Sequence, residues 1–282
     1  MPELRQFARV RPGSGPPAAT VSRGFVHRVA VAEILLSGWS RTGKDRFIIT
    51  AQWPRAHRLH VSSDRSAYEP PLVAETVHQC GALLAHAEYE VPLGRQFGLH
   101  ELRVDTRSAH LAVGANPAEP VIDITVSEVH RRADRPTALR YGAAAQPGGE
   151  RVATGRTAVS WTNESVHRRL RGGRTADVLL SPDARPGRRR LRFDTARPVF
   201  FGHPQGHIPA CPVGGRPPGR TGARRTGAPG TGVVPCTPHL TSTELDRQVW
   251  AQVGEVGGAD VQVIALQGES MVSECLVSAV AG

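Results

Sequence analysis

The sequence has little of several residue types, and each shortage narrows the class of protein. Its 282 residues include four cysteines, with no Cys-x-x-Cys pair and no Cys/His spacing typical of zinc: Cys80, Cys211, Cys236 and Cys275. Neither a disulfide framework nor a metal site is indicated. No run approaches the ~20 apolar residues of a membrane-spanning helix, and the first residues contain no apolar signal core. We therefore expect a cytoplasmic protein without a membrane segment.

Lysine is almost absent. Lys44 is the one lysine, so the net charge of +10 comes from arginine, and together with 30 Gly and 23 Pro this composition is typical of a GC-rich gene. The arginines cluster within 168–190 and 216–225. No aromatic residues lie between them and no helix-turn-helix pattern adjoins them, so they favour solvated linkers over a nucleic-acid surface. We expect no nucleic-acid partner.

The longest stretch without turn signals is LVAETVHQCGALLAHAEYEV, residues 72–91. Its apolar residues recur at gaps of three and four, the period of a helix: Val73, Val77, Cys80, Leu84 and Ala87. Glu75 and Gln79 lie one turn apart in the otherwise apolar first turns. A carboxylate on so apolar a helix either has hydrogen-bond partners in the protein interior or takes part in binding or catalysis there.

Strand-like segments surround this helix, after a Pro/Gly/Ala-rich start (1–24) that we expect to be disordered. They are FVHRVAVAEILLSGWS (25–40) and DRFIITAQW (45–53) before it, then FGLHELRVD (97–105), HLAVG (110–114), VIDITVSEVH (121–130), TALRYGAAA (137–145) and VATGRTAVSWT (152–162). Turn residues separate them. This order predicts an α+β fold in which an antiparallel sheet wraps one long helix.

The second half of the chain repeats features of the first. Three segments echo three earlier ones in the same order: 192–207 echoes 45–57, 244–254 echoes 101–114, and 268–279 echoes 149–160. An internal repeat explains this better than chance. The Arg/Gly/Pro-rich residues 165–190 are then a linker between a first domain (25–164) and a second (191–282).

The second copy has no counterpart of the helix. Residues 210–236 are rich in Gly and Pro, which cannot maintain a long helix, so we expect them to be irregular. Two interpretations stay open: a flexible insertion, or a segment translated out of frame. With one choice of codons for Gly214–Gly219, a shift by one base encodes Glu-Ala-Ala-Arg-Gln-Ala, with the Glu/Gln spacing of Glu75 and Gln79. Other codons in the gene over 205–245 would remove the second interpretation.

Four motifs together resemble the A-factor biosynthesis proteins, the γ-butyrolactone synthases of actinomycetes. They are FVHRVAVAEILLSGW (25–39), FIITAQWPRAH (47–57), LVAETVHQCGALLAHAEYEVPLGRQF (72–97) and FGHPQGHIP (201–209). The resemblance implies tandem hotdog domains, the second here lacking its helix. It also implies transfer of a β-ketoacyl group from an acyl-carrier-protein thioester to the hydroxyl of dihydroxyacetone phosphate, without a cofactor. The sequence departs from the family after Pro209, where the Glu and Arg of the second helix have no counterpart.

This reaction needs an acceptor for the hydroxyl proton and donors for the developing oxyanion. Within the resemblance, Glu75 is the predicted base, with its pKa raised by desolvation, and Gln79 orients Glu75 or the acyl chain. The alternatives are a structural glutamate and an exposed helical glutamine. The N–H groups of residues 72–74, at the helix N-terminus, are the predicted oxyanion donors.

The phosphate requires a cation, and with one lysine in the chain this must be arginine. Arg55 and Arg95, with Arg58, flank the helix and are the predicted substrate-binding arginines, although surface arginines are common. The predicted polar loop residues of the site are His57, His203 and His207. The i, i+4 spacing of the last two lies outside a helix and does not indicate a metal site.

Three other classes of function remain open. A hotdog dehydratase or thioesterase would release a dehydrated acyl carrier or a free acid instead of a phosphorylated ester. A non-enzymatic regulator would bind a butyrolactone or DNA, and a complex with DNA would have to survive moderate salt. A degraded copy would have no activity.

Overall fold

The computed structural model describes residues 19–57, 60–107, 110–170, 188–190, 231–238, 249–255, 261–267 and 270–280. Its central element is α1 (Pro70–Ala87), an 18-residue helix. The predicted helix over 72–91 is therefore confirmed, with its end at Ala87 instead of Val91. Proline occupies the first two helical positions, where a missing N–H costs nothing. No helix in the described part of the chain is long and apolar enough to cross a membrane.

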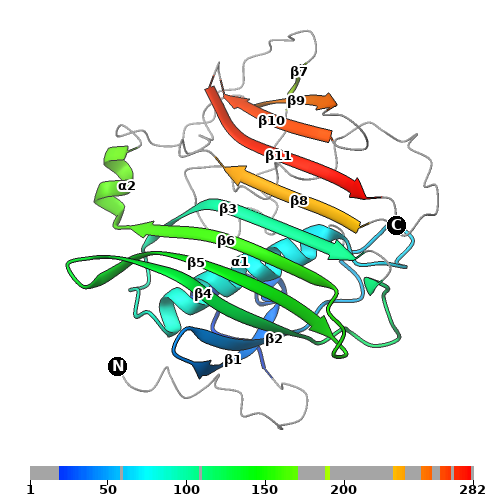
Figure 1. Cartoon of the computed structure of the whole chain (residues 1–282), viewed down its shortest axis with the longest axis horizontal. Coiled ribbons are helices and arrows are strands. Elements are labelled where there is room, and N and C mark those ends of the chain that lie inside the picture. Colours follow the sequence, from blue (N-terminus) through cyan, green and yellow to red (C-terminus); the bar gives the residue numbers. More distant parts are fainter. Residues whose placement is uncertain are drawn as a thin grey trace.

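The strands of the first half form an antiparallel sheet on one face of α1 (Figure 1). They are β1 (Leu36–Gly43), β2 (Arg46–Ala51), β3 (Gln96–Arg107), β4 (Pro120–Arg132), β5 (Arg135–Pro147) and β6 (Ala153–Thr162). In space their order is β1-β2-β4-β5-β6-β3. The α+β class and the sheet wrapped around a helix are confirmed. The segment 110–114 is not a strand, since it contributes only the isolated bridge of Ala112 with Ala67.

Small residues let α1 approach the sheet closely. A Cβ on Gly81 would lie 2.7 Å from the Tyr141 hydroxyl oxygen, and that hydroxyl donates a hydrogen bond of 2.6 Å to the Val77 carbonyl. Val77 and Gly81 therefore face β5. At about 100° per residue, Glu75 and Gln79 lie roughly 160° around the helix from them. The polar side of α1 consequently points away from β5.

The polar side of α1 is covered by the segment that precedes β1. Residues 25–35 are not a strand, contrary to expectation, but contain the end of one short 3-10 helix, η2 (Arg23–Val26), and all of another, η3 (Val31–Glu33). Gln79 supplies the reason, because its Nε2 donates to the Glu33 carbonyl at 2.9 Å and its Oε1 accepts from the Leu35 N–H at 3.0 Å. Side-chain hydrogen bonds from the helix thus occupy backbone groups that a strand would pair.

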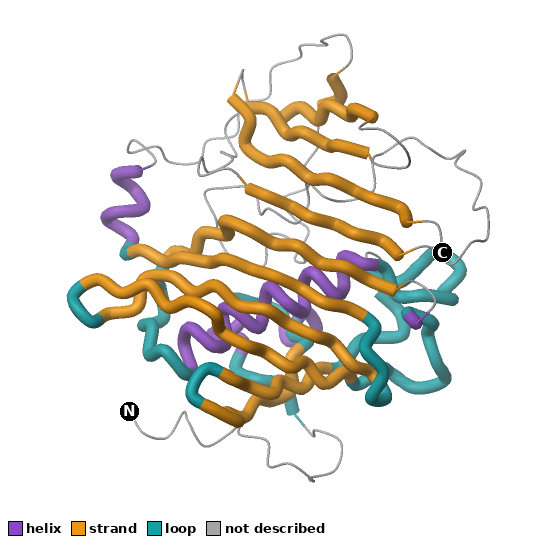
Figure 2. The backbone as a smooth tube through the Cα atoms, viewed as in Figure 1, coloured by secondary structure: helices purple, strands orange, loops and turns teal. Residues whose placement is uncertain are grey.

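The second half extends the same sheet from the β3 edge (Figure 2). Its strands are β7 (Arg188–Arg190), β8 (Thr231–Pro238), β9 (Val249–Glu255), β10 (Val261–Gln267) and β11 (Ser270–Val280). The order β8-β11-β10-β9-β7 repeats the order β3-β6-β5-β4-β2. The internal repeat is thereby confirmed, and so is the correspondence of 268–279 with 149–160. The match of 244–254 to 101–114 is wrong, because β9 occupies the place of β4.

Two segments expected to be irregular contain regular elements. Residues 231–236 belong to β8, which is paired with β3 on one side and β11 on the other, so tertiary pairing overrides the Gly/Pro-rich composition. Residues 165–190 include most of α2 (Glu164–Leu170), whose start is capped by Asn163 Oδ1 accepting the Val166 N–H at 2.8 Å. They also include β7. A second-copy helix would fall between β7 and β8, where residues 191–230 lie outside the described residues, so its absence stays a prediction.

Candidate active site

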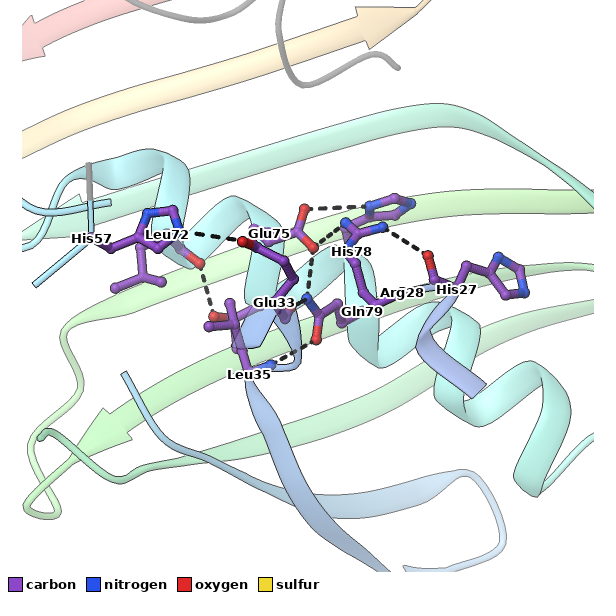
Figure 3. Close-up of polar contacts among 10 residues, drawn as sticks. His27, Arg28, Glu33, Leu35, His57, Leu72, Glu75, His78 and Gln79 are labelled. Carbon is purple, nitrogen blue, oxygen red and sulfur yellow. Dashed lines mark hydrogen bonds and ion pairs between the residues drawn. The ribbon is translucent and has the colours of Figure 1, made fainter. Parts of the chain in front are cut away.

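Glu75 lies in the second turn of α1, on its polar side, with a side chain that is 11% exposed. The Arg28 guanidinium forms an ion pair with its Oε1, and Gln79 Nε2 donates to the same oxygen at 2.7 Å (Figure 3). His78 Nδ1 is 3.9 Å from Oε2. One buried carboxylate thus faces a cation, an amide and an imidazole.

The pKa of Glu75 is lower than usual, contrary to the prediction of a raised value. Burial by itself raises the pKa of this carboxyl, but the positive charge of Arg28 opposes that effect, and His78 and Gln79 add to the opposition. Together these groups hold the pKa below the ordinary range, so the carboxylate is ionised at neutral pH. In this state Glu75 is a strong hydrogen-bond acceptor and a weak base.

Gln79 is 1% exposed and its amide is fully engaged. Its Nε2 donates both to Glu75 and to the Glu33 carbonyl, and its Oε1 accepts from Leu35. The alternative of an exposed helical glutamine is wrong. The hydrogen bonds fix Glu75 against the segment that carries Arg28, which fits the predicted orienting role.

Two stacked histidines lie in the loop between β2 and α1. The rings of His57 and His60 are 4.2 Å apart at 17°, and His57 Nε2 is 3.7 Å from Glu33 Oε2. His60 is 5% exposed, and its Nδ1 has no hydrogen-bond partner among the described residues. Burial first, and then the charge of His57, lowers the pKa of His60 to about 4, although Glu75 acts in the opposite direction. His60 is thus a neutral hydrogen-bonding group that the sequence pattern did not single out.

We predict that stability falls below pH 6.5 because His60 is buried in its neutral form. Its pKa of about 4 lies below the ordinary 6.5, so the unfolded chain takes up the proton first as pH falls. The stabilisation is complete above pH 6.5 and is lost towards pH 4, by roughly 3 kcal/mol at about 1.4 kcal/mol per pH unit. Urea unfolding of the wild-type chain and of His60→Gln between pH 7 and 4 measures this. The same pH dependence in both would contradict it.

Of the predicted phosphate-binding arginines, the two that the structure describes, Arg55 and Arg95, form no ion pair with Glu75. Arg55 is exposed and donates through Nε to the Gly114 carbonyl at 2.9 Å. Arg95 follows the far end of α1, and from Glu75 to that end the helix runs about 18 Å. The arginine beside Glu75 is instead Arg28. Arg58, His203 and His207 lie outside the described residues.

The predicted oxyanion donors at the start of α1 are already bonded. Pro70 and Pro71 have no N–H, and the Leu72 N–H donates to the Glu69 carbonyl at 2.9 Å. From Val73 onward each N–H has the carbonyl four residues earlier as its helical partner. The first turn, which lies wholly within the described residues, therefore offers no unused N–H to a ligand. Among the described residues, no group of three His, Cys, Asp or Glu side chains is arranged to bind a metal ion.

The sequence matches the family model for the A-factor biosynthesis (AfsA) hotdog domain over residues 12–163. A 2-oxo-3-(phosphooxy)propyl 3-oxoalkanoate synthase from Streptomyces virginiae is 36% identical, over 92% of this chain and 97% of the relative. The chain belongs to the A-factor biosynthesis hotdog family. A synthase of the same name from Streptomyces coelicolor is 29% identical, over 83% of this chain and 82% of the relative.

Solved structures agree with the hotdog fold of the family. An acyl-ACP thioesterase from Bacteroides thetaiotaomicron superposes with a TM-score of 0.51 at 11% identity, covering 82% of this chain and 97% of the thioesterase. The 12:0-ACP thioesterase from Umbellularia californica also gives 0.51, at 9% identity, covering 86% of this chain and all of its own. At such low identities these likenesses establish the fold alone.

Proposed function

We propose that this A-factor family member transfers a β-ketoacyl group from an acyl-carrier-protein thioester to dihydroxyacetone phosphate. The observation that carries the proposal is the 36% identity to the Streptomyces virginiae synthase over nearly the full length of both chains. A 2-oxo-3-(phosphooxy)propyl 3-oxoalkanoate is a β-ketoacyl ester of the free hydroxyl of dihydroxyacetone phosphate. The name of that relative's product therefore defines both the acyl group and the acceptor oxygen.

The reaction exchanges a thioester for an ester. The acceptor hydroxyl oxygen attacks the thioester carbonyl, a C–O bond forms, and the C–S bond breaks. The hydroxyl proton is accepted by a base and passes to the departing thiolate. Atoms and charge balance without an oxidant, a reductant or a cofactor, and a carrier-protein thioester supplies the activated acyl group. The cytoplasm is the proposed location of the activity, because both proposed substrates are cytoplasmic metabolites.

Glu75 is the proposed acceptor of the hydroxyl proton. Its burial, its position on the polar side of α1 and the fixed Gln79 amide support this role. Since the helix N-terminus has no unused N–H, the oxyanion requires side-chain donors. His60 and His78 are the proposed donors, because each has an Nδ1 atom without a hydrogen-bond partner among the described residues.

Product analysis tests the proposal. The purified chain is incubated with a 3-oxoacyl carrier protein and dihydroxyacetone phosphate, and the products are identified by mass spectrometry. The phosphorylated ester is expected as the main product. Free 3-oxo acid as the main product would instead indicate a thioesterase, and conversion of a 3-hydroxyacyl carrier protein to the enoyl form would indicate a dehydratase.

A further inference from the structure

Arg28 is a buried cation in direct contact with the proposed base. Its side chain is 12% exposed, and its Nη1 also donates to the His27 carbonyl at 3.2 Å. A buried Arg–Glu pair contributes little net stability, because both groups lose their hydration and an apolar pair of the same shape is often as stable. A role in ligand binding therefore explains the presence of this buried ion pair better than a contribution to stability does.

The backbone before Arg28 is fixed by contacts with both α1 and β3. His27 has a positive φ of 53°, and its Nε2 lies 2.7 Å from His86 Nε2 near the end of α1. Its ring packs edge-on against Phe97 with centroids 4.6 Å apart. These contacts position the Arg28 guanidinium next to Glu75. They do not depend on the ion pair, so Arg28 can change its partner while the segment stays in place.

The ion pair conflicts with the proposed role of Glu75 as a base. A carboxylate paired with arginine has little tendency to take a proton. The acceptor in the proposed reaction carries a phosphate, and a guanidinium binds phosphate through two parallel hydrogen bonds. A phosphate bound by Arg28 would therefore compete with Glu75 for the same cation.

We propose that Arg28 is the phosphate ligand of the acceptor, and that phosphate binding separates Arg28 from Glu75 and so converts the carboxylate into a base. This inference rests on the proposed function for the identity of the acceptor. Without the phosphate, Glu75 stays paired and inactive, so water or an unphosphorylated alcohol is not activated. With it, the base is released only when the acceptor is in place.

The surroundings of the pair provide independent support. His60 interacts electrostatically with both members of the pair, and His78 interacts with Glu75. Neither buried Nδ1 atom has a hydrogen-bond partner among the described residues, although His78 Nδ1 lies 3.9 Å from Glu75 Oε2. Buried polar atoms normally have hydrogen-bond partners, so two that lack one near a buried cation indicate a binding site for a polar ligand. A phosphorylated acceptor fits this set of groups, with its phosphate on Arg28 and the oxyanion of the reacting carbonyl on the two imidazoles proposed as its donors.

Binding of inorganic phosphate, measured by titration calorimetry without an acyl donor, tests the inference. Removal of the competing carboxylate by Glu75→Gln is expected to tighten phosphate binding at least about tenfold, even though it removes the base. In the double variant Glu75→Gln/Arg28→Gln, an amide pair of similar shape replaces the ion pair, and phosphate binding is expected to disappear. Arg103→Gln, which removes an exposed arginine of β3, is the control and should change nothing.

Three results would overturn the inference: no phosphate binding by Glu75→Gln, equal binding by the double variant, or loss of binding in Arg55→Gln or Arg95→Gln instead.

A second assay compares dihydroxyacetone phosphate with dihydroxyacetone as acceptors. The preference for the phosphorylated acceptor should fall at least about a hundredfold in Arg28→Lys, mainly through KM. An unchanged preference contradicts the inference but leaves the proposed function intact, whereas absence of ester in the wild type contradicts the proposed function alone.

Discussion

Replacement of Glu75 by glutamine is expected to lower kcat for ester formation at least about a thousandfold, within the range of general acid–base catalysis. The amide preserves the size of the side chain and its oxygen can still accept hydrogen bonds from Arg28 and Gln79, but it cannot take the hydroxyl proton. Loss of the ion pair is expected to reduce stability by roughly 1–3 kcal/mol. Ester formation under saturating substrates, below the unfolding temperature of the variant, is the measurement.

Glu88→Gln is the matched control for this experiment. Glu88 follows α1 directly, pairs with Arg41 at 2.9 Å and accepts a hydrogen bond from Trp39, with a side chain 6% exposed. Its replacement should lower stability by a similar amount and leave kcat within about twofold. If both variants lose activity equally, the effect of Glu75→Gln comes from the fold and not from proton transfer.

Replacement of Gly81 by valine is expected to lower the free energy of unfolding by roughly 3 kcal/mol, because overpacking outweighs the small gain in helix propensity of valine over glycine. Even the first added carbon would lie 2.7 Å from the Tyr141 oxygen, and the ring of Tyr141 is buried. Urea unfolding at pH 7 measures the change. Failure to obtain folded protein would be the extreme of the same result.

Tyr141→Phe tests whether the contact with the Tyr141 hydroxyl causes the loss of stability in Gly81→Val. It removes the nearest atom but also the 2.6 Å hydrogen bond to Val77, so alone it should cost roughly 1 kcal/mol. In the Tyr141→Phe background the cost of Gly81→Val should be smaller by at least about 1 kcal/mol. Ala87→Val, at a half-buried position of the same helix, is the control for a β-branched side chain in this helix without the Tyr141 contact, and should cost below about 1 kcal/mol. If the losses of unfolding free energy caused by Gly81→Val and Tyr141→Phe simply add in the double variant, the packing explanation is contradicted.

The central helix and its polar pair could be predicted from the sequence for physical reasons. A period of three and four residues requires only local spacing, and a carboxylate in so apolar a helix must be satisfied or used. The same logic failed for residues 25–35, where Val, Ile and Leu favour a strand but Gln79 occupies the backbone hydrogen bonds. That error concealed Arg28, because only the folded segment brings it next to Glu75.

Other errors have the same origin in contacts between distant residues. The pKa of Glu75 depends on a cation 47 residues away in the sequence, and burial alone pointed to the opposite shift. His60 is more deeply buried than His57, and no local pattern reports that difference. The strand β8 forms in a Gly/Pro-rich stretch because β3 offers an edge to pair with. Repetition in the sequence indicated two copies, whereas the sheet order determined which strands correspond.

The ratio of ester formed to carrier thiol released in a single turnover tests the central claim most directly. It is measured with a 3-oxoacyl carrier protein and an excess of the purified chain, with and without dihydroxyacetone phosphate. Direct transfer at Glu75 predicts one ester per thiol with the acceptor present, and negligible thiol release either without it or in Glu75→Gln. Rapid thiol release without the acceptor, accompanied by free 3-oxo acid and unaffected by Glu75→Gln, would contradict the account.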